Sequence, residues 1–268
     1  MSQIQLEKGP GRPLLLAANR LTQPPLGLRG VVRAIGYAAR WIPRWRSYPT
    51  IGPDGAPFLL DFSDGHFSWV SGGWCIAHYE HVLDQLANDA VVLDIGANIG
   101  VVTRAAAARC RAGWVHAFEP DPFNFRHLQR NCRDYPNIVC HPMALAGVSG
   151  RIGFSGAATP SVERYIEPAQ SGGRQMVPCQ RLDEWCAIQS ITRIDLVKID
   201  VEGFEEEILL PAETVLRRFR PAVIFEIGGS VGVRSRHGGR ELLPLFQRLG
   251  YAVQRFEGTC DFVAIPSS

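Results

Sequence analysis

The chain has 268 residues, of which 46% are hydrophobic and 20% charged, and its formal net charge is +2. This length and balance are typical of a globular protein with one large α/β domain and an extension or small cap. No apolar run approaches the roughly 20 residues that cross a bilayer, so we expect no transmembrane segment.

The cysteine content favours a reducing environment. There are seven cysteines, an odd number, and no Cys-x-x-Cys pair occurs. This pattern favours free thiols over a disulfide framework or a zinc site. We therefore expect a cytoplasmic protein. The cysteines are Cys75, Cys110, Cys132, Cys140, Cys179, Cys186 and Cys260.

Positive charge is concentrated at the start of the chain. Residues 1–50 contain one Lys, seven Arg and one Glu, so the remainder is net acidic. This is not the overall balance of a nucleic-acid-binding protein. After a loosely ordered start over residues 1–25, an apolar face predicts a helix over residues 28–45. Such a helix either packs on the main domain or, being basic and Trp-bearing, contacts a membrane surface or an anionic substrate.

The next segment predicts a hairpin followed by a helix. Pro53, Asp54 and Gly55 form a turn signal between two short apolar runs, so residues 48–51 and 58–62 are expected to pair. Residues 74–86 have a helical pattern. Glu80 and His81 lie in that helix just before the next strand, which makes them candidate wall residues of a cofactor cleft.

From residue 91 onward, short apolar runs alternate with helical patterns. This alternation predicts a mostly parallel, doubly wound α/β sheet with helices on both faces. We expect strands near residues 91–95, 115–118, 138–142, 194–199, 222–227, 251–255 and 260–265, and helices near residues 98–110, 122–133, 203–218 and 239–249.

Two features modify this sheet. An extra segment near residues 150–180 predicts a β-arm, in which residues 151–154 pair with residues 175–179. Only Glu257 and Gly258 separate the last two strands, so these form a hairpin and the final strand is antiparallel. We place the domain boundary after residue 75, between an N-terminal extension or cap (1–75) and the main domain (76–268).

The turn after strand 91–95 carries the main chemical signal. Asp94, Gly96, Asn98 and Gly100 precede an Ala-rich helix, and glycines there let the backbone approach a ligand at the helix N-terminus. Glu119 ends the next strand, where a carboxylate can accept hydrogen bonds from both ribose hydroxyls. Asp94 can bind the amino group of a methionine but would repel a pyrophosphate. The pattern therefore favours S-adenosylmethionine (SAM) over NAD.

Further motifs extend this pattern, namely Phe118-Glu-Pro-Asp-Pro122, Lys198-Ile-Asp-Val-Glu-Gly203, Arg220-Pro221 and Glu226. With the turn motif they resemble the FkbM family of SAM-dependent methyltransferases, mostly O-methyltransferases of sugars, polyketides and related metabolites. The resemblance covers about residues 80–227, whereas residues 1–75 match no motif of the family. It implies the Rossmann-like class I SAM methyltransferase fold, with a seven-stranded sheet.

The resemblance also implies residue roles. Glu119 takes the ribose hydroxyls, and Asp200 lies beside the methyl-donating sulfonium. Pro120 follows Glu119 at the adenine edge. The remaining implied contacts are Asp94, Gly96, Ala97, Asn98 and Gly100 on the methionine and ribose side, Met143, Ala144 and Leu145 beside adenine, and Glu80 near the methionine end.

Methyl transfer to a hydroxyl is an in-line displacement in which the acceptor loses a proton, so close positioning and a general base are expected. Candidates at or beyond the carboxyl ends of strands are Asp200, Glu202, Glu226 and His237, although a loop histidine such as His237 also fits a solvated surface role. Asp200 and Glu226 end neighbouring strands and could share Mg²⁺, but nothing in the spacing requires it.

Other charged residues in these motifs have structural interpretations. Lys198 is expected to pair with a nearby carboxylate. Asp183 is expected to cap the short helix that follows it. Glu205, Glu206 and Glu207 are expected to form a solvated helix N-terminus that the helix dipole favours.

The sequence thus predicts a SAM-dependent O-methyltransferase with a small hydroxylated acceptor. The alternatives are an N-methyltransferase of a small amine and an inactive methyltransferase fold that serves as a scaffold. A nucleic-acid acceptor is not expected, because the main domain is acidic and no Asp/Asn-Pro-Pro-Tyr/Phe motif follows the fourth strand. Oligomerisation and peripheral membrane contact by the basic start are left open.

Overall fold

The computed structural model describes residues 47–61, 76, 78, 80–154, 166–167, 175–227 and 239–267. The helix expected over residues 28–45 and the candidate base His237 lie outside these ranges. Within them, no helix combines the length and hydropathy that crossing a bilayer requires.

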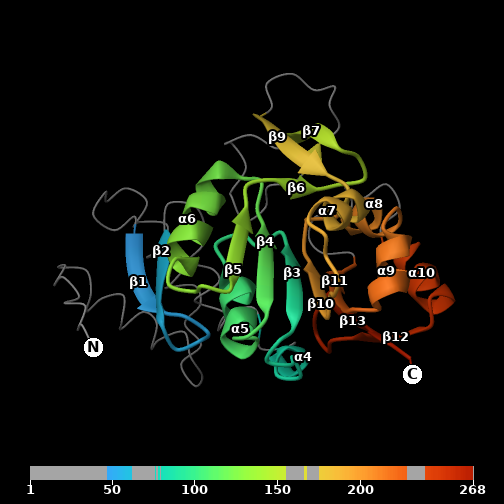
Figure 1. Ribbon diagram of the computed structural model, residues 1–268, viewed down its shortest axis with the longest axis horizontal. Helices are drawn as coiled ribbons and strands as arrows, with labels where there is room; N and C mark the ends of the chain where they lie inside the picture. Colours follow the sequence, from blue (N-terminus) through green and yellow to red (C-terminus); the bar gives the residue numbers. More distant parts are fainter. Residues whose placement is uncertain are drawn as a thin grey trace.

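The centre of the molecule is a seven-stranded sheet with the order β12-β13-β11-β10-β3-β4-β5 (Figure 1). Six of the seven strands run in the same direction, and β13 is antiparallel to both of its neighbours. The predicted fold class is therefore confirmed. The strands are β3 (Val91–Ile95), β4 (Trp114–Phe118), β5 (Ile138–His141), β10 (Leu196–Ile199), β11 (Ala222–Glu226), β12 (Tyr251–Arg255) and β13 (Asp261–Pro266).

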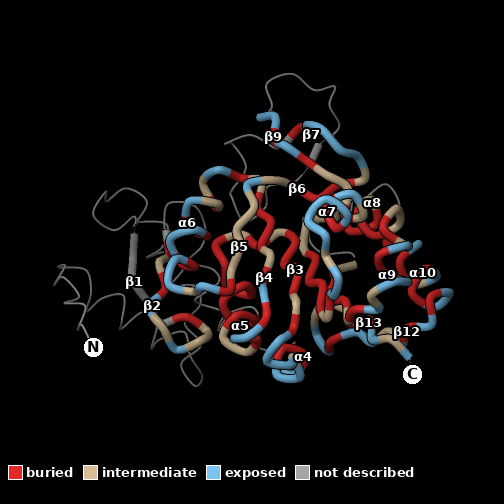
Figure 2. The backbone as a smooth tube through the Cα atoms, in the orientation of Figure 1, coloured by how far each residue is buried: buried red, intermediate tan, exposed pale blue. Residues whose placement is uncertain are grey.

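Helices cover both faces of the sheet, so the domain has three layers (Figure 1). β3 shows why its sequence is apolar almost throughout: Val92 packs into the core on one face, and Leu93 and Ile95 pack into the core on the other. Figure 2 shows the buried residues gathered along the central strands. The helices are α4 (Glu80–Leu83), α5 (Val101–Arg109) and α6 (Pro122–Cys132) on the first face, and α7 (Leu182–Ile188), α8 (Glu205–Leu209), α9 (Glu213–Phe219) and α10 (Leu242–Arg248) on the second.

Three helices differ from the sequence expectation. The helix predicted over residues 203–218 is divided into α8 and α9 at Pro211, because proline has no amide hydrogen to continue a helix. α5 starts at Val101, three residues later than predicted, since Asn98 and Gly100 both have positive φ. Of the helix predicted over residues 74–86, the described part forms only the single turn α4.

The predicted hairpin is present. β1 (Ser47–Ile51) pairs antiparallel with β2 (Pro57–Asp61). Phe58 and Leu60 of β2 are buried in the same core as Val92 and the inner side of α5. β2 therefore shares a core with the sheet of the main domain, and the boundary after residue 75 stays a prediction.

The β-arm is also present, in a larger form than predicted. β7 (Gly150–Phe154) pairs antiparallel with β9 (Gln175–Gln180), and two short strands extend the pair to a four-stranded sheet, β6-β9-β7-β8. These are β6 (Ala144–Leu145) and β8 (Ile166–Glu167). The arm lies beyond the carboxyl ends of the parallel strands (Figure 1).

Candidate active site

The chain reverses its winding direction between β3 and β10. From β3 the sheet continues through β4 and β5 on one side, and through β10 and β11 on the other. Ligands of open α/β sheets bind at such a switch point, outside the carboxyl ends of the strands. Residues 96–100, here called the glycine loop, leave β3 at this place.

The start of the glycine loop lies against the backbone of β10. Gly96 has φ +79, and a Cβ at this position would come within 2.0 Å of the carbonyl oxygen of Asp200. The amides of Gly96 and Ala97 both donate to the Phe118 carbonyl oxygen, at 3.1 and 2.9 Å. The loop therefore requires glycine at its first position, and β4 and β10 hold it on either side.

The second half of the loop turns sharply into α5. Asn98 has φ +51 and Gly100 has φ +94, both in the left-handed region. A Cβ at Gly100 would meet Leu128 Cδ1 of α6 at 2.9 Å. The Asn98 amide donates to Glu119 Oε2 at 2.8 Å, which fixes the strained residue.

Glu119 is the buried carboxylate beside the loop, with 5% of its surface exposed. Its Oε1 accepts a hydrogen bond from the Asp121 amide at 2.8 Å. Burial raises the pKa of Glu119 to about 8, against the two amides, which favour the charged form. Each carboxylate oxygen has a second lone pair, so Glu119 can still accept bonds from a ligand diol.

Asp94 and Lys198 form a buried polar pair below the loop. Asp94 Oδ2 accepts a hydrogen bond from the Thr103 hydroxyl at 2.6 Å, and its Oδ1 lies 3.6 Å from Lys198 Nζ. Lys198 Nζ also donates to the Gly96 carbonyl oxygen at 3.2 Å and lies 3.4 Å from Asp200 Oδ2. Burial opposes a charged Lys198, but Asp200 and Asp94 outweigh it and raise its pKa. The expected pairing of Lys198 with a carboxylate is observed.

Two hydrogen-bond acceptors beside the glycine loop lack a partner. Asp94 Oδ1 and Asn98 Oδ1 are buried and have no hydrogen-bond partner among the described residues. Buried polar atoms normally have one, so a ligand that brings hydrogen-bond donors fits here. The ammonium group of a methionine is such a donor. With the cradle at Gly96 and the carboxylate of Glu119, these residues fit SAM.

The residues expected at the adenine edge follow β4 and β5. Pro120 comes directly after Glu119, whose amide donates to the His141 carbonyl oxygen at 3.1 Å. Met143 donates to the same carbonyl at 2.9 Å, and Ala144, next in the chain, is buried. The structure thus brings Pro120, Met143 and Ala144 to the edge that carries Glu119.

A row of carboxylates lies at the carboxyl edge on the other side of the switch point. Asp200 follows β10, Glu226 ends β11, and Asp261, which is paired with Glu226, begins β13. Burial, together with repulsion from Asp200 and Asp261, raises the pKa of Glu226 to about 7. Burial also raises the pKa of Asp261, although His78 Nε2 lies 2.7 Å from its Oδ2.

Asp261 was not among the candidate residues expected from the sequence, which were sought at or beyond the carboxyl ends of parallel strands. An antiparallel strand brings its first residue to the same edge of the sheet. The hairpin signal at Glu257 and Gly258 could have placed Asp261 there.

Glu80 is not part of this site. Its carboxylate lies 3.5 Å from Arg109, the last residue of α5, whereas the glycine loop lies at the start of that helix. A role at the methionine end does not fit this position. Glu202, by contrast, is two residues beyond Asp200 in a turn with φ +57.

Glu205 holds that turn, and the solvated helix N-terminus expected there is wrong for two of its three residues. Glu205 Oε1 accepts from the amides of Val201 and Gly203 at 3.1 and 3.4 Å, and burial raises its pKa to about 7. Glu206 is also buried and accepts from the Glu241 amide at 2.6 Å.

Asp183 does not cap α7. The cap position is Arg181, and the Asp183 carboxylate pairs with the Arg181 guanidinium at 2.6 Å. Asp183 lies inside α7, where its Oδ1 accepts a hydrogen bond from the Glu184 amide at 3.0 Å while the carboxylate pairs with Arg181.

Within the described ranges, the structure has neither a cluster of metal-ligating side chains nor a disulfide. Among these residues, no group of three or more His, Cys, Asp or Glu side chains is arranged to hold a metal ion, so shared Mg²⁺ at Asp200 and Glu226 gains no support. The six described cysteines are free.

The fold, with a glycine loop and an acidic residue at its switch point, is that of a Rossmann-like methyltransferase. The model of the family described as the methyltransferase FkbM domain matches residues 94–253, and the chain belongs to this family. The family resemblance seen in the sequence is confirmed.

Curated relatives are similar over about half of the chain. The hexuronic acid methyltransferase AglP of Haloferax volcanii is 31% identical over 152 residues, which are 56% of this chain and 61% of that protein. The 2-O-methyltransferase NoeI of Sinorhizobium fredii is 26% identical over 148 residues, 49% of this chain and 61% of that protein. The chain therefore spans about three fifths of either relative.

One solved structure with similarity to this chain is that of methyltransferase FkbM from Methylobacillus flagellatus KT. It matches 74% of this chain and 52% of that chain, with 15% identity and a TM-score of 0.45.

Proposed function

We propose that the protein is a SAM-dependent O-methyltransferase that acts on a hydroxyl of a small, sugar-like acceptor. The observation that carries the proposal is the glycine loop, which lies against Asp200 with Glu119 beside it. Membership of the FkbM family supports methyl transfer. The names of the two relatives, one acting on a hexuronic acid and the other a 2-O-methyltransferase, support a sugar-like acceptor and oxygen as the accepting atom.

The residues around the glycine loop would hold the methyl donor. Glu119 would accept hydrogen bonds from the ribose hydroxyls, and Asp94 Oδ1 and Asn98 Oδ1 would accept from the ammonium group. SAM, when bound, supplies an electrophilic methyl group on a sulfonium. Asp200, which follows the strand beside the loop, would position the sulfonium end of SAM. Catalysis gains when the methyl donor and the acceptor are held in line.

Glu226 is the general base in this proposal. A base works best when its pKa lies near the operating pH, and that of Glu226 is raised to about 7. The proton of the acceptor hydroxyl would pass to the Glu226 carboxylate as the oxygen attacks. Lys198 Nζ lies 3.4 Å from Asp200 Oδ2 and holds that side chain in place.

N-methylation of a small amine is the second candidate, because the row of Asp200, Glu226 and Asp261 would attract a cationic acceptor. Its ammonium group is a far stronger acid than a hydroxyl, so an amine acceptor depends less on a protein base. The cytoplasmic location, oligomerisation and membrane contact by the basic N-terminus stay predictions.

Calorimetry with SAM and S-adenosylhomocysteine (SAH) tests the proposal first. We expect micromolar binding of both, unchanged by EDTA, and loss of binding in Glu119→Ala. Transfer from labelled SAM to a panel of neutral sugars, uronic acids and amino sugars then identifies the acceptor class. Absence of binding by the folded wild-type protein would refute the proposal.

A further inference from the structure

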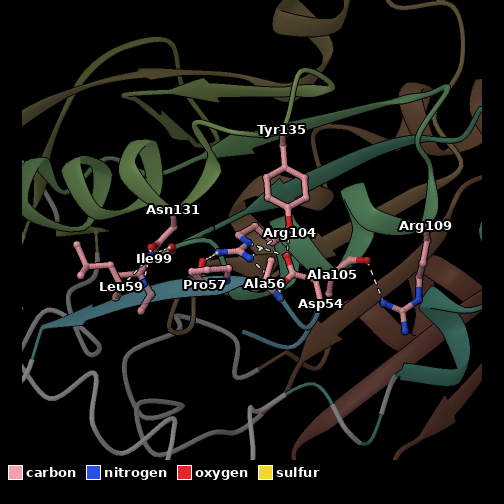
Figure 3. A network of polar contacts seen from close by, with 10 residues as sticks. All are labelled: Asp54, Ala56, Pro57, Leu59, Ile99, Arg104, Ala105, Arg109, Asn131 and Tyr135. Atoms are coloured by element: carbon pink, nitrogen blue, oxygen red, sulfur yellow. Dashed lines mark hydrogen bonds and ion pairs between the residues drawn. The ribbon is translucent and has the colours of Figure 1, made fainter. Parts of the chain in front are cut away.

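The β1–β2 hairpin is hydrogen-bonded to α5 and α6, the two helices next to the glycine loop. It contributes none of the residues proposed to bind the methyl donor. Figure 3 shows the contacts: the turn and second strand of the hairpin meet Arg104 of α5, Asn131 of α6, and Tyr135 beyond α6. Arg104 lies four residues after the loop, and Asn131 faces the loop itself.

Asn131 joins the hairpin directly to the glycine loop. Its Oδ1 accepts from the Leu59 amide at 2.8 Å, and its Nδ2 donates to the Leu59 carbonyl oxygen at 3.1 Å, so the side chain pairs with β2 as a neighbouring strand would. The same Nδ2 donates to the Ile99 carbonyl oxygen at 2.9 Å. One buried amide thus binds both segments.

The Ile99 carbonyl needs such a partner. The backbone hydrogen bonds of α5 begin with the Arg104 amide, which donates to the Gly100 carbonyl oxygen at 3.1 Å, so Ile99 lies one residue before them. Ile99 also lies between Asn98 and Gly100, which have φ +51 and +94. A segment with left-handed residues on both sides keeps its shape only when surrounding contacts fix it.

Arg104 anchors the hairpin independently of Asn131. Its guanidinium binds both oxygens of Asp54, each at 2.7 Å, and donates to the Pro57 carbonyl oxygen at 2.6 Å. Tyr135 donates its hydroxyl hydrogen to Asp54 as well. With Arg104 fixing its turn, the hairpin is a rigid support to which Asn131 ties the loop.

We propose that Asn131 is a positioning residue through which the β1–β2 hairpin holds the glycine loop in the conformation that binds the methyl donor. Residues 47–61 would thus be required for binding at a site that they do not line. The identity of the ligand rests on the proposed function. The positioning itself can be tested without it.

Asn131→Ala and Asn137→Ala form a matched pair for the test. Asn137 is also a buried asparagine, and its Nδ2 donates to the carbonyl oxygens of Ala107 and Cys110, at 3.1 and 2.9 Å, where α5 ends. Both variants lose buried hydrogen bonds to the α5 region, but only Asn131 touches the glycine loop. We expect similar losses of thermal stability.

SAH titration by calorimetry should separate the two variants. We expect roughly tenfold weaker binding in Asn131→Ala, equivalent to about 1.4 kcal/mol, and wild-type affinity in Asn137→Ala. Equal affinities in the two variants, whether both unchanged or both reduced, would overturn the proposal. Asn131→Asp, which keeps the acceptor for Leu59 but loses both donated bonds, serves if the alanine variant does not fold.

Hydrogen exchange of the ligand-free protein provides a readout that does not depend on SAM. Amides of residues 97–100 should exchange faster in Asn131→Ala than in the wild type or in Asn137→Ala. Unchanged exchange there would overturn the proposal. If the wild type does not bind SAH but this difference is seen, the proposed function fails while the positioning role stands.

Discussion

Arg104 and Asp54 form an ion pair at 2.7 Å in which each side chain is only 1% exposed. The guanidinium also lies over the Phe58 and Tyr135 rings, at 4.9 and 5.1 Å from their centroids. The charge partner of this buried arginine of α5 therefore lies in the turn of a hairpin 50 residues earlier in the chain.

Removal of Asp54 should strongly destabilise the protein. Asp54→Ala leaves Arg104 as an uncompensated buried charge, so the free energy of unfolding should fall by about 3–5 kcal/mol. Asp89→Ala is the control, because the Asp89–Arg193 pair is exposed to solvent, and its loss should leave stability nearly unchanged. Urea denaturation measures both. Similar small effects would show that the buried pair does not anchor the hairpin.

A side chain at Gly96 should abolish binding of the methyl donor. Gly96→Ala brings a Cβ against the Asp200 carbonyl, so the glycine loop and β10 must separate. Gly258→Ala, on the β12–β13 turn, is the control, since Gly258 has nearly the same φ, +73, and open space around its Cβ position. It should cost about 1–2 kcal/mol of stability without loss of SAH binding. Calorimetry on both folded variants decides.

The affinity for SAH should fall as the pH is lowered below about 8. Ribose hydroxyls donate hydrogen bonds, so they bind best to ionised Glu119, whose pKa burial raises to about 8. Protonation then competes with the ligand, and affinity should drop by up to about tenfold per pH unit below the pKa and level off above it. Glu119→Gln should remove the part of the pH dependence that is due to Glu119. Any change of affinity with pH that remains in this variant comes from the ionisable groups of SAH. A flat profile in the wild type would contradict the assignment.

Loss of the carboxylate at Glu226 should slow the reaction with a hydroxyl acceptor. Glu226→Gln should lower kcat by roughly 10²–10⁴-fold and leave SAH binding intact, because a general base contributes about that factor. In the wild type, kcat should rise with pH up to about 7, where Glu226 ionises, and this limb should vanish in the variant. Glu257→Gln, on the exposed β12–β13 turn, is the control. Wild-type rates in Glu226→Gln would favour an amine acceptor.

Local patterns in the sequence predicted most of the fold, because strands such as β3 are buried on both faces and thus apolar throughout. The division of a helix at Pro211 was missed, although proline itself gave the signal. The buried position of Glu206 could not be foreseen, since its partner is the amide of Glu241, 35 residues later in the chain.

Part of the candidate site could likewise be predicted from the sequence, and part could not. The motif around Gly96 and the acidic residue at Glu119 have a fixed spacing, so the sequence shows them directly. Asn131 gives no such signal, because its partners are backbone atoms at Leu59 and Ile99, distant along the chain. Pairing Arg104 with Asp54 likewise requires the tertiary structure.

The position of β3 in the sheet also sets the order of events during synthesis. Its neighbour β4 begins at Trp114, directly after α5, but its other neighbour, β10, leaves the ribosome about a hundred residues after β3. Until then, β3 has an open edge that can pair with another chain. Nascent chains that stop before β10 therefore combine an aggregation-prone strand with a glycine loop that lacks one of its two walls.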